Sequence, residues 1–247
     1  MFGDIPAEQT REAIEQAARE ALAEAGVSGP PVDAVEMARR LGLAVARDGV
    51  ATTRARFVNL GGAAGIGTIF LADEPRPERR QWAVAHELGE AYAHRVFAEL
   101  GVDPATDASG AREAVANRFA GCLLLPREWF AAEGAACEWD LAELKARFAT
   151  ASNELVARRM LEMRPTVIIT QWDQGRIVWR RSNLAGRVPL VAACEEDARR
   201  VAHEQGLAAR CERSELPDGV EDVRAWPIHE EGWRREFVRT EVAEVWD

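Results

Sequence analysis

The stretch from residue 80 to 94 constrains this chain most, because it puts metal-ligand residue types on one face of a helix. It reads RQWAVAHELGEAYAH, and its apolar residues recur at three-to-four spacing, which predicts a helix over about 78–100. In the zinc-peptidase pattern H-E-x-x-H, histidines at i and i+4 hold a metal ion, and the intervening glutamate is the general base. Here His86 and Glu87 fit that pattern, and Glu90 stands where the second histidine is expected.

Helix geometry allows Glu90 to take the vacated ligand position. Residues four apart lie about 6 Å apart along the axis and about 40° from alignment, so one ion can contact both. His94 lies eight residues beyond His86, about 12 Å along the helix, and cannot share a zinc ion whose ligand bonds are about 2 Å long. We therefore interpret His94 as a solvent-facing residue or as the partner of a neighbouring polar group.

Composition excludes several classes of protein. The net charge of −10, from 31 basic and 41 acidic side chains, argues against a general binder of nucleic-acid phosphates, which needs a basic surface. No apolar run approaches the ~18 residues of a membrane span. The four cysteines form no C-x-x-C pair, and the sequence starts without an apolar signal segment. We therefore expect a cytoplasmic protein with reduced thiols and no membrane partner.

The elements before this helix are predicted from periodicity and turn residues. They are a helix over about 6–25, a short helix capped by Asp33, a strand near 43–45, and strands over 52–60 and 65–71 on either side of Gly61-Gly62. The last strand, with Gly67, Thr68 and Ile69, directly precedes the 78–100 helix. It is either a sheet edge that binds an extended peptide through main-chain hydrogen bonds or an ordinary sheet edge.

A third ligand is expected on the following helix, predicted over 111–125. Thermolysin-like peptidases take that ligand from a glutamate on a later helix, and Glu113 lies 26 residues beyond Glu87. Asn117, one turn further on, is placed to orient a ligand or substrate. The alternative for Glu113 is a solvated helix face. Its place just before the N-x-F-A and L-L-L-P segments favours the ligand role.

The order of these motifs resembles the ImmA/IrrE family of metallopeptidases. The resemblance rests on a strand, the A-H-E-L-G start of a helix, and a helix with E-x-x-x-N-x-x-A-x-x-L-L-x-P, and it covers roughly residues 30–165. It implies a zincin-like α+β core with a small mixed sheet, His86 and Glu113 as metal ligands, and Glu87 as general base. It also implies a protein substrate, because the family cuts helix-turn-helix transcriptional repressors that control stress-response or mobile-element genes.

The glutamate at position 90 departs from the family pattern. A His86, Glu90 and Glu113 set lowers the positive charge felt by a bound water and so weakens its activation. Zinc is the expected ion, with manganese and iron as alternatives: oxygen-rich sites favour harder ions such as manganese more, although sets of histidine and carboxylate ligands do hold zinc and iron. With Glu87, three carboxylates are expected around one point, and they repel one another unless a cation is present or one carboxylate stays protonated. The competing interpretation is a pseudo-peptidase without metal that acts as a regulatory or sensor module.

The remainder of the chain predicts two further parts. Residues 140–163 form two short amphipathic helices like a helix-turn-helix, but five basic residues balance five acidic ones over 138–164, which favours packing over direct nucleic-acid binding. A hairpin over 166–180, a helix over 195–205 and strands near 223–228 and 236–242 follow. His203 and His229 have no partner visible in the sequence.

We therefore expect three segments: a metallopeptidase core over 1–137, a helix-turn-helix-like segment over 138–164, and a β-rich regulatory or dimerisation extension over 165–247. The leading hypothesis is a metal-dependent endopeptidase that cuts a helix-turn-helix repressor. A pseudo-peptidase that binds such a partner is the second hypothesis, and a DNA-binding regulator that uses residues 140–163 is the third.

Overall fold

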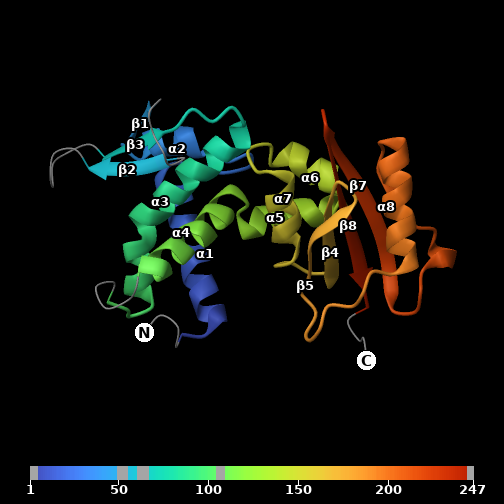
Figure 1. Ribbon diagram of the computed structural model, residues 1–247. Coiled ribbons are helices and arrows are strands. Elements are labelled where there is room, and N and C mark those ends of the chain that lie inside the picture. The colour runs from blue at the N-terminus through green and yellow to red at the C-terminus, as the bar shows by residue number, and fades with distance from the viewer. Residues whose placement is uncertain (1–4, 49–54, 60–66, 104–108, 244–247) are drawn as a thin grey trace. The chain divides into compact units, whose positions relative to one another are not determined.

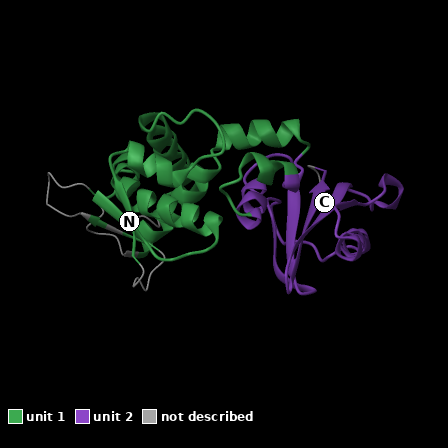
Figure 2. Cartoon of the chain, turned by 90° about the horizontal axis from the view of Figure 1, so that it is seen from above, with its two compact units in different colours: residues 1–138, 143–152 green, residues 139–142, 153–247 purple. Residues whose placement is uncertain are grey.

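The chain forms two compact units. A computed structural model describes residues 5–48, 55–59, 67–103 and 109–243. One unit contains residues 1–138 and 143–152, and the other contains residues 139–142 and 153–247 (Figure 2). The division runs through the segment 138–164. Helix α6 (Leu141–Arg147) starts in the second unit and continues in the first, and α7 (Asn153–Met160) belongs to the second.

The first unit contains a three-stranded mixed sheet. Its strands are β1 (Ala44–Arg47), β2 (Ala55–Asn59) and β3 (Gly67–Leu71), in the order β1-β3-β2. β3 pairs in parallel with β1 and antiparallel with β2, so the predicted antiparallel pair is present. The prediction that β3 is a sheet edge is wrong, because strands bond to it on both sides. Thr68 and Ile69 pair with both neighbours, and Gly67 pairs with Asn59 of β2, so β3 is not an edge to which an extended peptide could add. The predicted Gly61-Gly62 turn lies outside the described residues.

Helices make up the rest of the first unit (Figure 1). They are α1 (Ala7–Glu24), α2 (Ala34–Arg40), α3 (Pro77–Glu99), α4 (Ser109–Leu124) and α5 (Arg127–Ala136), followed by most of α6. α1 presents Ile14, Ala18 and Leu22 to the core at the spacing of one helix face. Asp33 caps α2 as predicted, because its side chain accepts hydrogen bonds from the backbone amides of Val35 and Glu36.

The second unit is a five-stranded antiparallel sheet with α8 (Ala193–Gln205) on one face. Its strand order is β5-β4-β8-β7-β6. The strands are β4 (Val167–Asp173), β5 (Arg176–Ser182), β6 (Ala209–Arg210), β7 (Val220–Glu230) and β8 (Trp233–Val242), and a 3₁₀ turn spans Arg213–Glu215. Ala198 and Ala202 of α8 pack against Val223 and Val238 of the two longest strands. Small residues on α8 thus let the helix lie close to the sheet.

The predicted α+β fold is confirmed, with the two helices that carry the motifs, the mixed sheet, the short helix pair and the C-terminal α/β part all present. Helix α5 was not predicted. Within the described residues, no helix combines the length and apolar character that a membrane crossing requires. The four cysteines are all free, and Cys122 is buried in α4 as expected of a small apolar residue.

Candidate metal centre

Helix α3 carries two of the three candidate ligands on its solvent-facing side. The opposite side buries Val84, Ala85 and Leu88, which fixes the rotation of the helix against the core. His86 and Glu90 are therefore left partly exposed, one turn apart. Pro75 and Pro77 separate α3 from β3, and Pro77 is the first residue of the helix, where its missing N–H costs nothing.

Gly89 brings helix α4 close enough to contribute the third ligand. A Cβ atom at this position would lie 2.8 Å from the backbone Cα and O of Ala116, which is closer than packed atoms approach. The two helix backbones therefore cross with only a glycine between them. Glu113 lies three residues before Ala116, on the side of α4 that reaches His86.

The candidate ligand atoms of His86, Glu90 and Glu113 converge, as the sequence predicts. One nitrogen of the histidine and one oxygen of each carboxylate all lie within 4.8 Å of one another. His86 Nε2 is 3.5 Å from Glu113 Oε2. Ligand atoms about 2 Å from a tetrahedral ion stand about 3.3 Å apart, so the set must contract by at most about 1.5 Å to hold one ion. The donor set of one nitrogen and two oxygens fits a divalent ion.

Arg112 is the site residue that sequence reasoning missed. Its guanidinium Nε bonds to Glu90 Oε2, and another of its nitrogens donates to the backbone oxygen of Glu90 at 3.1 Å. The arginine is adjacent to Glu113 in the sequence but reaches across to α3. The carboxylate that replaces the second histidine is therefore already paired with a cation. No periodicity signals a contact of this kind, because it depends on how the two helices cross.

The remaining predicted residues surround this cluster. Asn117 donates a hydrogen bond from Nδ2 to Glu113 Oε1 at 2.9 Å, one turn along α4, which fits its predicted orienting role. Glu87 is buried beside His86. His94 is exposed, with Nδ1 2.8 Å from the backbone oxygen of Ala91 in the preceding turn, and so lies outside the ligand set.

A polar contact with α1 holds the far end of α3. Tyr92 stacks on Phe119 of α4, with ring centroids 5.6 Å apart, and its hydroxyl donates to Glu24 Oε2 at 2.7 Å. Arg95 also pairs with Glu24, and this hydrogen bond with that of Tyr92 lowers the pKa of the Glu24 carboxyl. Burial, together with the Glu24 contact, raises the pKa of Tyr92 well above its usual range. The tyrosine therefore stays a neutral donor that ties α1 to the helix carrying His86.

Comparisons with known proteins agree with this arrangement. The family model described as an IrrE N-terminal-like domain, peptidase M78, matches residues 38–161, which include every residue of the candidate metal centre. A Mycobacterium tuberculosis transcriptional regulator has a similar fold over both units. Its TM-score is 0.63 at 21% sequence identity, and the match covers 96% of this chain and 80% of that one. A search of curated proteins finds no match. Because the family model covers half of the sequence and its motifs meet at one site, this chain belongs to the IrrE N-terminal-like (peptidase M78) family.

Proposed function

We propose that this chain is a metal-dependent endopeptidase whose substrate is a helix-turn-helix transcriptional repressor. The observation that carries the proposal is the convergence of His86, Glu90 and Glu113. Family membership supports a metallopeptidase-like core. The named repressor class rests on the family resemblance, and the regulatory name of the M. tuberculosis protein is consistent with it.

In this proposal, the three ligands hold a divalent ion, with zinc expected first and manganese or iron as alternatives. Such an ion supplies a Lewis acid and lowers the pKa of a water molecule that attacks the peptide carbonyl. The Glu87 carboxylate takes a proton from that water and delivers it to the leaving amine nitrogen. Asn117 keeps the Glu113 carboxylate oriented through its hydrogen bond.

A second candidate function is favoured by the ion pair between Arg112 and Glu90. A guanidinium that neutralises the substituted ligand supplies part of the positive charge that a metal ion would supply. The family fold could then persist as a module that binds a repressor without cutting it. In that case Glu87 has no proton to move, and the partner surface alone carries the function.

Direct nucleic-acid binding by the short helix pair is not favoured, because its basic side chains pair with acidic ones. Lys145 pairs with Glu78, Arg147 with Glu133, Arg158 with Glu154, and Arg159 with Glu162. Side chains held in such pairs have to exchange a carboxylate for each phosphate they contact, which reduces the gain from counterion release.

The test combines cleavage and binding. The purified full chain, loaded with zinc or manganese, is incubated with candidate helix-turn-helix repressors from the same genome, and fragments are identified by mass spectrometry. We expect the wild type to cleave the repressor and Glu87→Gln to leave it intact. The control Glu99→Gln, which changes an exposed glutamate of the same helix, should still cleave it. Repressor binding without any cleavage, unchanged by Glu87→Gln and independent of metal, would support the second function and overturn the first.

A further inference from the structure

A second group of metal-ligand side chains lies in the C-terminal unit, far along the sequence from the first. It joins His203 of α8, His229 of β7 and Glu236 of β8. His203 Nδ1 is 2.7 Å from Glu236 Oε1, and His229 Nε2 is 3.0 Å from the same oxygen. The two rings meet edge to face with centroids 5.5 Å apart. One ligand atom from each residue lies within 4.8 Å of the others.

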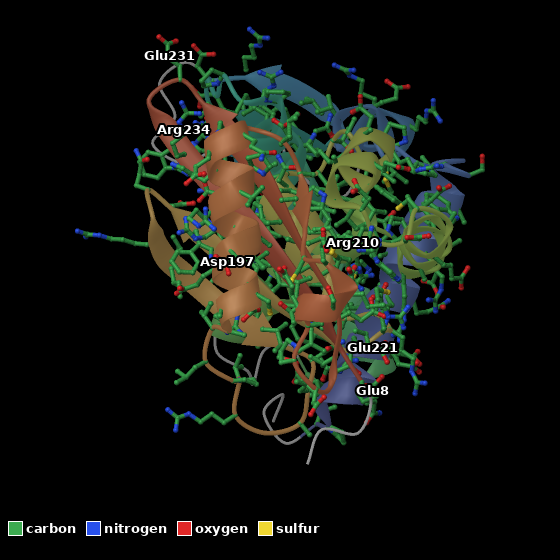
Figure 3. All side chains as sticks on the ribbon, turned by 90° about the vertical axis from the view of Figure 1, so that its right-hand side faces the viewer. Glu8, Asp197, Arg210, Glu221, Glu231 and Arg234 are labelled. Carbon is green, nitrogen blue, oxygen red and sulfur yellow. The ribbon has the colours of Figure 1, made fainter. Side chains whose placement is uncertain are left out.

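The sheet register explains why these residues meet. Glu236 pairs with Pro227 across the β7–β8 ladder, and His229 lies two residues beyond Pro227 on the same face. This is the face that α8 covers, since the buried Val238, two residues along β8, packs against Ala202. His203 follows Ala202 directly and reaches Glu236 from above. Figure 3 looks onto this face, with α8 lying over the sheet.

Glu236 is the buried centre of the group. The residue is 0% exposed, and its Oε2 atom has no hydrogen-bond partner among the described residues. The guanidinium of Arg199 comes only to 3.9 Å from that oxygen, and it stacks on Trp172 with 4.6 Å between its Cζ and the ring centroid. A carboxylate removed from water needs compensation at both oxygens, and the nearest guanidinium lies 3.9 Å from Oε2 without a hydrogen bond to it. A cation on the histidine side supplies that compensation.

We propose that His203, His229 and Glu236 form a second metal site, which binds a divalent first-row transition ion such as zinc. Two imidazole nitrogens and one carboxylate oxygen form a ligand set that suits such ions and leaves a coordination position open. The His203 side chain is 41% exposed, so the ion can enter from solvent beside α8. Because the ligands come from a helix and two strands, a bound ion clamps α8 to the sheet. This proposal does not rest on the peptidase function.

Arg234 disfavours metal binding, because its hydrogen bond to His229 fixes which ring nitrogen of that histidine carries the proton. Its Nη1 lies 2.7 Å from His229 Nδ1, and a guanidinium can only donate. Nδ1 is therefore an acceptor, and the ring proton is on Nε2, where it points at Glu236. Coordination through Nε2 moves that proton to Nδ1, which must then part from Arg234. Arg234 is exposed at the β7–β8 turn (Figure 3), so it is free to turn away.

His203 undergoes the equivalent proton shift without obstruction. Its Nδ1 donates to Glu236 in the metal-free state, and coordination moves that proton to Nε2. Among the hydrogen bonds that coordination breaks, the one between Arg234 and His229 can be removed by a substitution that leaves all three ligands in place.

The experiment isolates this site by disabling the first one. The full chain has four histidines, so His86→Ala leaves His94, His203 and His229. Zinc binding to this variant is measured by titration calorimetry, and cobalt is substituted to record the absorption of a protein-bound ion. We expect about one ion per chain. His203→Ala, added to His86→Ala, should weaken binding at least tenfold, the loss that follows even from removing a partner of a metal ligand. His94 is an exposed histidine that belongs to neither candidate metal group. His94→Ala, added to His86→Ala, is therefore the matched control and should leave zinc binding unchanged.

Arg234→Gln gives the decisive result, because only a three-ligand metal site predicts that zinc binds more tightly when this guanidinium is removed. If the site binds an ion, removal of the guanidinium frees Nδ1 and tightens zinc binding. Unchanged or weaker binding in Arg234→Gln would mean that His229 does not supply its Nε2 and would overturn the three-ligand site. The absence of zinc from His86→Ala, or binding that His203→Ala leaves intact, would overturn it as well. These outcomes leave the peptidase proposal untouched, because they are all measured without the first site.

Discussion

Gly89→Ala is the substitution that tests most directly how the first metal centre is assembled. The added Cβ would lie 2.8 Å from backbone atoms of Ala116, and ordinary contact begins near 3.4 Å, so α4 must move away by about 0.6 Å. Overpacking of this kind costs about 1–3 kcal/mol. The higher helix propensity of alanine offsets about 1 kcal/mol of this destabilisation. We therefore expect a net loss of about 1 kcal/mol and a wider gap between His86 and Glu113.

The control is Gly110→Ala in the same helix pair. A Cβ added at Gly110 would have nothing within 4 Å, so this variant gains only the propensity, up to about 1 kcal/mol. Thermal unfolding followed by circular dichroism should show Gly89→Ala melting roughly 2–4 °C below the wild type, with Gly110→Ala at or above it. Zinc affinity should fall only in Gly89→Ala. Equal stability and equal zinc affinity in the two variants would refute the close helix crossing, and with it the reason why Glu113 reaches His86.

Four other outcomes follow from the structure. Arg112→Gln should tighten zinc binding by no more than about fivefold, as judged by competition with a chelator, because the ion pair it removes is exposed. Glu90→His should raise zinc affinity if position 90 faces the ion; an unchanged dissociation constant would count against that geometry. Asp173→Asn should lower stability by about 1 kcal/mol at neutral pH, since Arg235 forms two hydrogen bonds to this carboxylate and holds its pKa below the usual value. That contribution is present above the unfolded pKa and is lost as pH falls through the folded pKa, so the variant and the wild type should converge in acid denaturation. Burial raises the pKa of the Cys211 thiol to about 11, so its alkylation by iodoacetamide should be slow at pH 8 and accelerate toward pH 11, as measured by mass spectrometry.

Local patterns in the sequence predicted the elements because each pattern reports one face of one segment. The apolar spacing around Leu88 placed α3, and Asp33 marked the start of α2. The edge position of β3 could not be predicted in the same way. Its second neighbour, β1, pairs in parallel from more than 20 residues earlier, and nothing within 65–71 reveals that pairing.

The same distinction between local patterns and long-range contacts separates the site residues that were predicted from those that were missed. His86, Glu90 and Glu113 were predicted, because a motif and a helix period fix two of them and a family resemblance supplied the third. Arg112 was missed because its target is a residue 22 positions away on another helix. The group around Glu236 was also missed, since its members come from α8, β7 and β8, and they meet only through the register of the sheet and the small residues beneath the helix.

The strength of the ion pair between Arg112 and Glu90 decides whether it can compete with a metal ion for the Glu90 carboxylate. Arg112 is 58% exposed, and exposed ion pairs contribute about 0–1 kcal/mol, which corresponds to at most about a fivefold change in an equilibrium constant. If the proposed site holds an ion through one imidazole and two carboxylates, that binding would outweigh the ion pair, and the guanidinium alone would not exclude the ion. While no ion is bound, Arg112 offsets the repulsion between the converging carboxylates of Glu90 and Glu113. A histidine at position 90 would need no such partner. In the proposed metalloenzyme the arginine and the substituted glutamate would act together: the exposed guanidinium stabilises the acidic site and would give way to a divalent ion.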